Sequence, residues 1–535
     1  MLPSARLPWF STSHEAAAVV GRTPHATLSG SADGFRAFAS VALPDSSTSE
    51  KQKKKKPITV AGESKLHIAM FPWLAFGHMI PFLEFAKLVA EKGHKISFSS
   101  TPKNIDRLPK LPPHLASLIY FIKLPLPQIN HLPQNAEATI DVPLDDVWYF
   151  KKAYDGLQQP MAQLLQSLSP DWLLLDFAAY WLPSIARSLN IPNAFFSIVT
   201  AACLGYLGPP SFLMHGDEDH KKPEDYAVLP KWVTFPSTVR LKLYEVLKIY
   251  NGITGDKTNT SDFYRFGATL KDCDMVAVRS CMELEPEWLK LLEQLYEKPV
   301  IPVGELPTTD YNNSEETEGW KSMKEWLDKQ EKGSVVYIAF GSEAKPSQEE
   351  LNEIAQGLEF SGLPFLWVLR KSRGSTDAEP IKLPEGFEER TKERGVVLTT
   401  WAPQLKILAH DSIGGFLTHT GWSSVVEAPQ FLRPLILFTF LADQGINARL
   451  LEEKKIGYSI PRKEQDGSFT RNSVAESLRL VVVEDEGKIY RDKAKEMKRV
   501  FGDRDKQNWY LDNFLGYLEN HRRLKNPEVD GIDQN

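Results

Sequence analysis

The stretch "LHIAMFPWLAFGHMIPFLEFAKLVAEKGHKISFSST", residues 66–101, decides the fold class. It opens with an apolar run, "LHIAMFPW", and passes through a glycine-containing loop, "LAFGHM". The segment "IPFLEFAKLVAEKG" then shows the apolar spacing of a helix that ends at Gly93. A second apolar run, "HKISFSST", follows. A strand, a helix and another strand in succession predict parallel strands joined by a helical crossover.

The same alternation continues along the chain in two series. The first goes on through "DWLLLD", "YWLPSIARSLN" and "NAFFSIV". The second comprises "SVVYIAFGS", "PSQEELNEIAQGLEFSG", "PFLWVLR", "GVVLTTWAP", "IGGFLTHTG" and "PLILFTF". Between them, "IPVGELPTTDYNNSEETEGW" is rich in Pro, Asn and Glu and has no sustained period. These patterns predict two Rossmann-like α/β domains, with a cleft at the carboxyl ends of both parallel sheets.

The predicted domain boundaries follow these changes in composition and apolar periodicity. We expect an extension over residues 1–64, an N-terminal domain over 65–305, a linker region over 306–330, a C-terminal domain over 331–500, a helix returning to the N-terminal domain over 501–523, and a tail over 524–535.

Composition narrows the classes of function. A chain of 535 residues is too long for one compact core, and its 42% hydrophobic and 25% charged content is ordinary for a globular protein. A net charge of −6 gives no reason to expect nucleic acid as a partner. The three cysteines, Cys203, Cys273 and Cys281, have no metal-ligand spacing. We expect a cytoplasmic monomer with reduced thiols.

Two segments could suggest other locations. Residues 1–64 are rich in Ser, Ala and Arg and end near the basic block "EKQKKKKP". We expect a disordered extension; a plastid transit peptide is the alternative, although Glu15, Asp33 and Asp45 speak against it. The uncharged stretch 194–214 is broken by Gly and Pro, so a buried strand and a short helix are expected there instead of a membrane span.

Polar residues follow three apolar strands of the second series. They are Gly341 and Ser342, then Trp401, then Thr420 and Gly421. A helix opening at residues 421–424 would offer free N–H groups and a positive dipole end to a phosphate. We expect further donors from Ser342, His419, Ser423 and Ser424, a stacking face from Trp401, ribose contacts from Gln404 and Glu427, and sugar contacts from Asp443 and Gln444. Taken singly, each could instead be a helix cap or a core residue.

Together these residues resemble the signature box of plant UDP-dependent glycosyltransferases. The order W-x-P-Q, H-x-G-W-x-S-x-x-E and D-Q-x-x-N-A is present between Trp401 and Glu453, and the likeness extends over most of the chain from Leu66 to about Arg522. The resemblance implies the GT-B fold, two facing Rossmann-like domains. It also implies that Trp401 stacks on uracil and that the Ala402 backbone pairs with it. The implied donor-binding set is Gly341, Ser342, Trp401, Ala402, Gln404, His419, Gly421, Trp422, Ser423, Ser424, Glu427, Asp443 and Gln444.

Three positions in this box depart from the family pattern. Ser423 stands where Asn is commonest, which keeps a donor but shortens its reach. Pro429 falls inside the phosphate-binding helix, where proline costs roughly 3 kcal/mol. Leu432 stands where Gly often ends that helix, so a positive φ there would cost about 1 kcal/mol or more.

The first domain is expected to supply the base. His78 follows the first strand and Asp176 ends "DWLLLD", so both lie at carboxyl ends of strands. A His oriented by a buried Asp is suited to deprotonating an acceptor hydroxyl. Each could also be a helix-start residue; the resemblance aligns them with the family's catalytic pair. It implies one-step displacement with inversion at the anomeric carbon. We expect no metal, because a helix dipole and hydroxyl groups could hold the diphosphate and we identify no acidic D-x-D pair that would ligate an ion.

The acceptor is the least constrained part of this interpretation. The sequence looks most like the plant branch that extends sugar chains on flavonoid or terpenoid glycosides, with glucose or rhamnose as the transferred hexose. "DDVWYFKKAYDGL" and "AACLGYLGPPSFLM" could line an apolar acceptor pocket or belong to the core. Alternatives are transfer from another nucleotide sugar, a phosphorylase-like reaction, and an inactive UDP-sugar-binding protein. A dehydrogenase is disfavoured, because no G-x-G-x-x-G follows the first strand.

Overall fold

The computed structural model describes residues 65–143, 146–255, 260–308, 317–341, 343–344, 346–369, 382–400 and 402–523. The chain divides into two units, Met1–Glu63 and Ser64–Asn535. The predicted extension over residues 1–64, the tail over 524–535, Ser342 and Trp401 lie outside the described residues.

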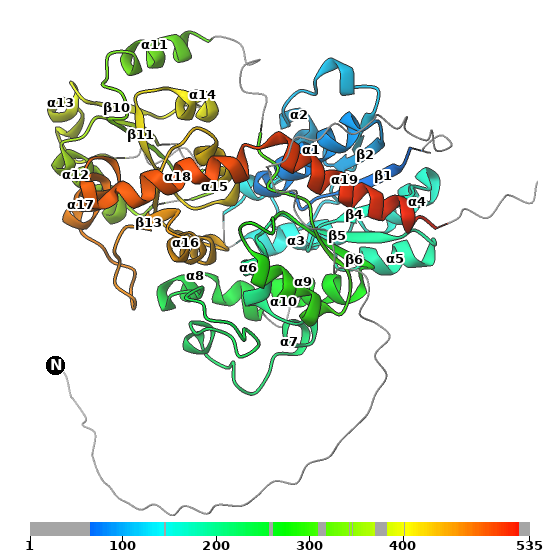
Figure 1. Ribbon diagram of the computed structural model, residues 1–535. Coiled ribbons are helices and arrows are strands. Elements are labelled where there is room, and N and C mark those ends of the chain that lie inside the picture. Colours follow the sequence, from blue (N-terminus) through cyan, green and yellow to red (C-terminus); the bar gives the residue numbers. More distant parts are fainter. Residues whose placement is uncertain are drawn as a thin grey trace, which may run out of the picture. The chain divides into compact units, whose positions relative to one another are not determined.

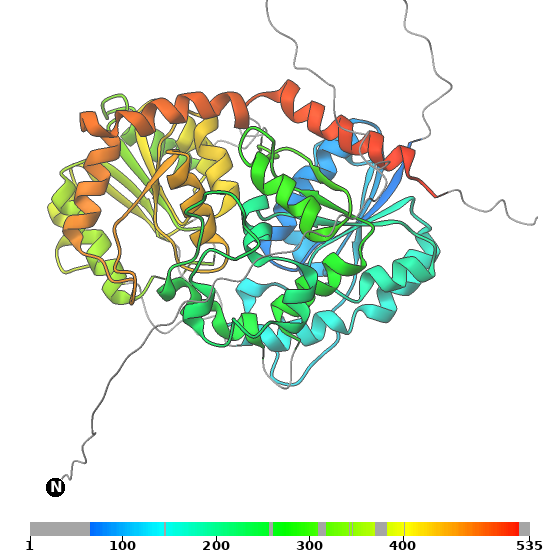
Figure 2. The same ribbon diagram turned by 60° about the horizontal axis from the view of Figure 1, so that its bottom comes forward.

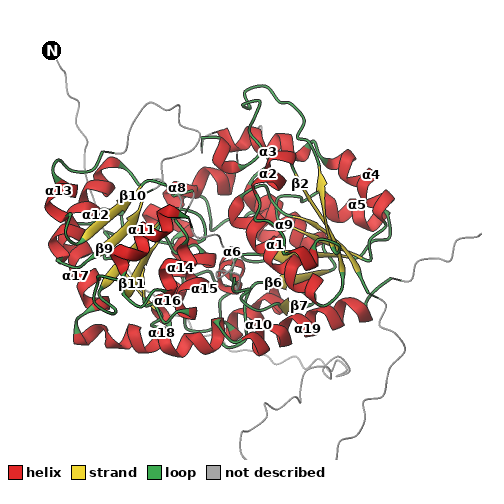
Figure 3. Cartoon of the chain, turned by 90° about the horizontal axis from the view of Figure 1, so that it is seen from above, coloured by secondary structure: helices red, strands yellow, loops and turns green. Residues whose placement is uncertain are grey.

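The second unit contains two parallel sheets with helices on both faces, as the sequence predicted (Figures 1 and 3). The first sheet has the order β3-β2-β1-β4-β5-β6-β7. Its strands are β1 (His67–Phe71), β2 (Lys95–Ser100), β3 (Ile119–Lys123), β4 (Trp172–Leu175), β5 (Asn193–Ser197), β6 (Met275–Val278) and β7 (Val300–Pro302). The second sheet has the order β10-β9-β8-β11-β12-β13. Its strands are β8 (Val335–Ala339), β9 (Phe365–Val368), β10 (Gly395–Leu398), β11 (Ile413–Thr418), β12 (Leu435–Leu437) and β13 (Gly457–Ser459).

Helices connect these parallel strands. The helices of the first series are α1 (Phe76–Glu91), α2 (Pro102–Arg107), α3 (Val147–Asp155), α4 (Gln158–Leu168), α5 (Leu182–Ser188), α6 (Ala201–Leu207), α7 (Pro210–His215), α8 (Leu243–Thr254), α9 (Asp262–Asp272) and α10 (Pro286–Tyr296). The helices that follow are α11 (Glu318–Leu327), α12 (Gln348–Ser361), α13 (Phe387–Thr391), α14 (Gln404–Ala409), α15 (Trp422–Gln430), α16 (Gln444–Glu453), α17 (Arg471–Val482), α18 (Lys488–Phe501) and α19 (Arg504–Asn520).

The alternation of side chains along β1 explains how the first sheet is covered. Ile68 and Met70 belong to the core on the α1 and α19 side, whereas Ala69 and Phe71 belong to the core on the opposite face. All four are buried, as expected for a strand covered on both faces.

The register places the strand ends that matter for function next to each other. In the first sheet Phe71 pairs with Leu175, so the residues after β1 and β4 emerge side by side. In the second sheet Thr418 pairs with Ala339, so the loops after β8 and β11 also emerge together. Carboxyl ends of parallel strands are the usual position of ligand sites in such folds.

The last two helices lie end to end along one side of the unit (Figure 2). The first of them, α18, packs against α15 and α17, whereas α19 packs against α1 and β7. Leu511, Phe514 and Leu518 of α19 enter the core beside the first sheet, and the indole of Trp172 donates to the Leu518 carbonyl at 2.9 Å. The chain therefore returns to the first sheet after completing the second.

Several elements differ from the sequence pattern. Helix α1 begins at Phe76, earlier than the predicted start at Ile80, because the backbone N–H groups of His78 and Met79 bond to the Ala75 carbonyl. The predicted linker contains α11, whose Trp320 is buried. The stretch 194–214 forms β5, α6 and α7, and no helix in the described ranges is long and apolar enough to cross a membrane.

Candidate active site

His78 and Asp176 come together at neighbouring strand ends of the first sheet. His78 lies in the first turn of α1, and Asp176 directly follows β4. The Nδ1 atom of His78 is 2.8 Å from Oδ2 of Asp176. The Asp176 side chain is 2% exposed, whereas that of His78 is 20% exposed. The imidazole is therefore bonded on its buried side and accessible on the other.

The Asp176 carboxylate is held by the backbone. Its Oδ2 accepts a hydrogen bond from the Trp73 N–H at 3.0 Å, and its Oδ1 accepts one from the Phe177 N–H at 2.7 Å. Backbone donors stabilise the ionised carboxylate and fix its orientation. Asp176 is thus placed to select the His78 tautomer that carries a proton on Nδ1, leaving Nε2 as an acceptor.

The pKa of His78 reflects two opposing effects. Burial alone would lower it, but the charge and hydrogen bond of Asp176 raise the pKa above its ordinary value of 6.5. Smaller contributions in the same direction come from Glu343 and Asp443, which belong to the second sheet's loops. The side chain of Thr139 also donates to Glu343 at 2.8 Å. His78 therefore lies where the strand ends of the two sheets meet.

Asp443 and Gln444 mark the start of α16. Asp443 accepts a hydrogen bond from the side chain of Asn447 at 2.7 Å, and burial raises its pKa. The carbonyl oxygen of the Gln444 side chain accepts the backbone N–H groups of Phe440 and Leu441. These bonds fix the loop before α16 and leave the carboxylate of Asp443 beside His78.

The amino end of α15 is arranged differently from an ordinary capped helix. Its N-cap residue is Gly421, which offers no side-chain cap. The hydroxyl of Ser423 accepts a hydrogen bond from Arg279 at 3.0 Å, and that of Ser424 accepts one from Gln404 at 3.1 Å. Both hydroxyls thus bond to residues outside the helix, and the positive end of the helix dipole keeps its preference for an anion.

His419 lies between two glycines that the sequence placed in the donor set. A Cβ atom added to Gly341 would lie 2.7 Å from Nε2 of His419, and one added to Gly421 would overlap the same nitrogen. Burial lowers the pKa of His419 to about 4, so its ring is neutral near pH 7. Among the described residues, its Nδ1 is buried without a hydrogen-bond partner. A neutral imidazole in this position can donate to a phosphate oxygen.

Gln404 and Glu427 form a direct pair. The Gln404 amide donates to Oε2 of Glu427 at 2.6 Å. Burial raises the pKa of Glu427 to about 7, and the hydrogen bond from Gln404 opposes that rise. The two side chains therefore offer adjacent polar atoms of the kind that bind the vicinal hydroxyls of a ribose. Ala402, just before α14, is buried.

Trp422 has a different environment from the other predicted donor-binding residues. Its indole is buried and donates to the carboxyl group of Glu305 at 2.8 Å. Its ring meets Phe501 of α18 edge-on, with centroids 6.5 Å apart. In this structure Trp422 joins α15 to the first sheet's domain and to α18.

Helix α15 accommodates the two unusual residues at its carboxyl end. Pro429 lies one residue before the last helical position, Gln430. Leu432 then adopts a φ of 66°, and the Arg433 N–H bonds to the Ala428 carbonyl at 3.1 Å. A left-handed residue with this back-bonding is a common way to end a helix, usually with Gly in that position. Leu432 therefore adopts the left-handed conformation whose cost was considered from the sequence.

Sequence reasoning missed Arg279, Glu305 and Glu343. Arg279 directly follows β6, and Glu305 follows β7. Both belong to the first domain, yet they bond to Ser423 and Trp422 of α15. A charged residue immediately after the apolar run "MVAV" was the available signal for Arg279.

The two segments considered as acceptor walls are partly core. In α3, Phe150 and Tyr154 are buried, and the Tyr154 ring stacks on Phe71 with centroids 5.1 Å apart. Helix α6 is almost entirely buried and packs on α10 and α16. Trp148 and Tyr149 of α3 are half-buried.

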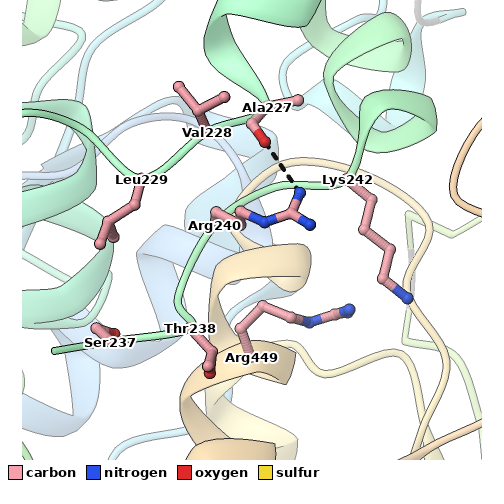
Figure 4. A pocket seen from close by; sticks show the side chains of 8 residues that line it. All are labelled: Ala227, Val228, Leu229, Ser237, Thr238, Arg240, Lys242 and Arg449. Carbon is pink, nitrogen blue, oxygen red and sulfur yellow. Dashed lines mark hydrogen bonds between the residues drawn. The ribbon is translucent and has the colours of Figure 1, made fainter.

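A separate cavity of about 630 Å³ lies beside the segment before α8 (Figure 4). It is lined by Ala227, Val228, Leu229, Ser237, Thr238, Arg240, Lys242 and Arg449. Two of its cations are balanced by acids: Arg240 is 3.0 Å from Glu464, and Arg449 is 3.0 Å from Glu452. None of the predicted site residues lines this cavity.

The described residues contain no group of three or more His, Cys, Asp or Glu side chains that could hold a metal ion. Cys203, Cys273 and Cys281 are buried free thiols.

Comparison with known proteins gives consistent matches. The family described as UDP-glucoronosyl and UDP-glucosyl transferase matches residues 263–516. The chain is 55% identical to UDP-glycosyltransferase 91A1 of Arabidopsis thaliana, over 86% of this chain and 98% of that protein. It is 44% identical to the soyasaponin III rhamnosyltransferase of Glycine max, over 86% of this chain and 97% of that protein.

A solved structure matches most of the chain. Phytolacca americana UGT2, complexed with UDP-2fluoro-glucose and pterostilbene, superimposes with a TM-score of 0.67 at 27% identity. The match covers 85% of this chain and 100% of that one. The two facing parallel sheets therefore form the GT-B fold that the sequence resemblance implied.

Proposed function

Because this chain belongs to the UDP-glycosyltransferase family, we propose that it transfers a hexose, glucose or rhamnose, from a UDP-sugar to a hydroxyl group of a small plant-type glycoside. The proposal extends to the acceptor class, the sugar of a flavonoid or terpenoid glycoside. The name of the Glycine max relative, a soyasaponin rhamnosyltransferase, supports a glycoside acceptor and a hexosyl donor.

The hydrogen bond between His78 and Asp176 is the observation that carries the proposed chemistry. With the Nδ1 proton donated to Asp176, Nε2 of His78 accepts the proton of the acceptor hydroxyl. The acceptor oxygen then forms a bond to the anomeric carbon as the bond from that carbon to the diphosphate oxygen breaks. UDP leaves with the electron pair, and attack from the opposite side inverts the configuration.

Asp176 stabilises the imidazolium that forms in this step. Its carboxylate is buried and fixed by two backbone N–H groups, so it need not reorganise as charge develops on His78. We propose that Asp443, whose charge acts on His78, accepts hydrogen bonds from hydroxyls of the transferred sugar. In this proposal Asp176 supports the base, and Asp443 binds the donor sugar.

The diphosphate carries negative charge as it leaves, so its binding site must have a positive electrostatic potential. We propose that it binds at the amino end of α15, with His419, Ser423 and Ser424 as donors, so that the negative charge is stabilised without a divalent ion. Gln404 and Glu427 would bind the ribose, and Trp401 with the Ala402 backbone would bind uracil.

A screen of donors and acceptors tests this proposal. Purified full-length protein would be incubated with UDP-glucose or UDP-rhamnose and with flavonoid and terpenoid glycosides alongside their aglycones. We expect products whose mass increases by one hexosyl or deoxyhexosyl unit, with an inverted anomeric linkage by NMR. Transfer to aglycones alone would contradict the proposed acceptor class. UDP binding without release of UDP in any combination would indicate an inactive binding protein.

A further inference from the structure

Arg279 is a buried cation without an ion-pair partner among the described residues. It follows β6 and is 4% exposed. Its Nε donates to the backbone carbonyl of Glu305 at 2.9 Å, and its Nη1 donates to the hydroxyl of Ser423 at 3.0 Å. Within the part of the chain that the structure describes, no carboxylate oxygen forms a salt bridge with its guanidinium. Burying an unpaired charge is costly, so such a residue usually serves a ligand or a partner.

The acidic side chains near Arg279 leave most of its positive charge uncompensated. Burial raises the pKa of Glu305 to about 8, so this carboxyl group is largely protonated near pH 7 and accepts the Trp422 indole. Burial likewise raises the pKa of Glu427 to about 7, and Gln404 donates to it. Glu84, the third acid in range, is paired with Lys87 at 2.7 Å.

The direction of the Arg279 side chain supplies the second observation. Ser423, to which it donates, lies in the first turn of α15, a nine-residue helix whose N-cap glycine supplies no side-chain cap. Arg279 therefore reaches from the first sheet's domain to the anion-binding end of a helix in the second.

We infer that Arg279 binds the diphosphate of the UDP-sugar donor, as a positioning residue that the N-terminal domain contributes to a site otherwise built by the C-terminal domain. The inference rests on the proposed function only in its choice of donor. A guanidinium offers a planar fork of N–H groups that matches phosphate oxygens, and two of its five N–H groups are assigned to protein acceptors. The diphosphate then supplies the missing negative charge and connects the two domains.

Calorimetric titration with UDP and with uridine tests this inference without requiring turnover. Uridine keeps the base and ribose but lacks the diphosphate. We expect Arg279→Gln to weaken UDP binding by about 10- to 100-fold and to leave uridine binding within about twofold. Arg279→Lys, which keeps the charge but loses the fork, should show an intermediate loss for UDP and serves if the Gln variant does not fold.

Ser423→Ala is the matched control. It removes the hydrogen bond to Arg279 and one proposed neutral donor to the diphosphate while keeping the buried charge, so its loss of UDP affinity should be smaller than that of Arg279→Gln. An equal loss of UDP and uridine affinity in Arg279→Gln would show that Arg279 only supports the fold of α15. Unchanged UDP affinity in Arg279→Gln and Arg279→Lys would overturn the inference while leaving the donor assignment intact. A wild-type protein that binds neither UDP nor uridine would overturn the donor assignment itself.

Discussion

The indole Nε1 of Trp422 donates a hydrogen bond of 2.8 Å to a buried carboxyl group, that of Glu305. Trp422 begins α15 in the second domain, whereas Glu305 follows the last strand of the first sheet, 117 residues earlier. A hydrogen bond to Glu305 therefore links α15, the helix that we propose binds the diphosphate, to the first domain. The protonation state of Glu305 depends on pH.

Glu305→Gln should make the protein more stable, and increasingly so as the pH rises. The ordinary pKa of Glu is 4.5, and burial raises that of Glu305 to about 8 in the folded protein. Between these values the folded state binds a proton that the unfolded state has lost, so stability falls as pH rises. The neutral amide removes this dependence while keeping an acceptor for Trp422. We expect the advantage of Glu305→Gln to grow by about 1.4 kcal/mol per pH unit between pH 6 and 7.5.

Melting curves or equilibrium unfolding at several pH values would measure this difference. Trp422→Phe is the control: it removes the hydrogen bond but keeps the carboxyl group, so its stability should decline with pH as the wild type does. If the stability of Glu305→Gln and of the wild type changed equally with pH, Glu305 would already be ionised in the folded protein.

His78→Ala should abolish transfer while preserving donor binding. Loss of a general base typically costs about 10²- to 10⁴-fold in rate, and His78 makes no hydrogen bond to the residues of α15 among those described. Steady-state kinetics and UDP titration on the same variant separate the two effects. Near-normal turnover would contradict the assignment of His78 as the base.

Asp176→Asn should lower the rate less and shift its pH dependence. In the wild type, kcat/KM should rise with pH through the pKa of His78, which Asp176 holds above 6.5. Without that carboxylate, burial dominates and lowers the pKa, so the acidic limb of the profile should move to lower pH with a reduced plateau. An unshifted limb would indicate that another group sets it.

Gly421→Ala should weaken donor binding through His419. The φ of Gly421 is −61°, so alanine suits its backbone, but the added methyl group would overlap Nε2 of His419. Displacing the imidazole should raise the KM for the UDP-sugar by about tenfold, the usual worth of one hydrogen bond to a charged group. Gly516→Ala in α19 meets nothing within 4 Å and is the matched control, with an unchanged donor KM. Equal KM values for the two variants would show that His419 does not contact the donor.

The sequence predicted the two sheets because apolar runs alternate with helix patterns along the chain. Four strands were not among the predicted runs: β3, β6, β7 and β13. The sequence also placed His78 and Asp176 at carboxyl ends of strands. The pairing of β1 with β4, which the sequence did not predict, explains their 2.8 Å contact. Their catalytic role, like the donor contacts, stays a prediction until it is measured.

Contacts between the domains were beyond the reach of sequence patterns. Arg279 and Ser423 are 144 residues apart, and nothing in either local pattern identifies the other as its partner. The start of α1 was misplaced for a local reason: the glycine in "LAFGHM" suggested a loop, whereas the helix begins at Phe76 and continues through Pro81. Helix α11 was missed because the Asn- and Glu-rich residues before it show no helical period, and the segment was therefore interpreted as a linker.

The carboxyl end of α15 should gain stability from two substitutions. Leu432 has a φ of 66° and a side chain 40% exposed, so Leu432→Gly should relieve left-handed strain while losing little buried surface. Pro429 lies inside the helix and has no N–H to offer the Val425 carbonyl, so Pro429→Leu should restore that bond. Together the two changes should raise the free energy of unfolding by roughly 1–3 kcal/mol.

The same double variant tests whether the proline affects the donor site at the other end of α15. If Pro429 misaligns Ser423 and Ser424, its replacement should also lower the KM for the UDP-sugar. Each single variant is the control for the other, because the residues are close enough for their effects to couple. Equilibrium unfolding, or melting curves if unfolding is irreversible, would be measured beside donor kinetics. Unchanged or reduced stability would mean that the helix has already adapted to Pro429, since the bonds of Leu432 and Arg433 back to residues 428 and 429 close the helix without it.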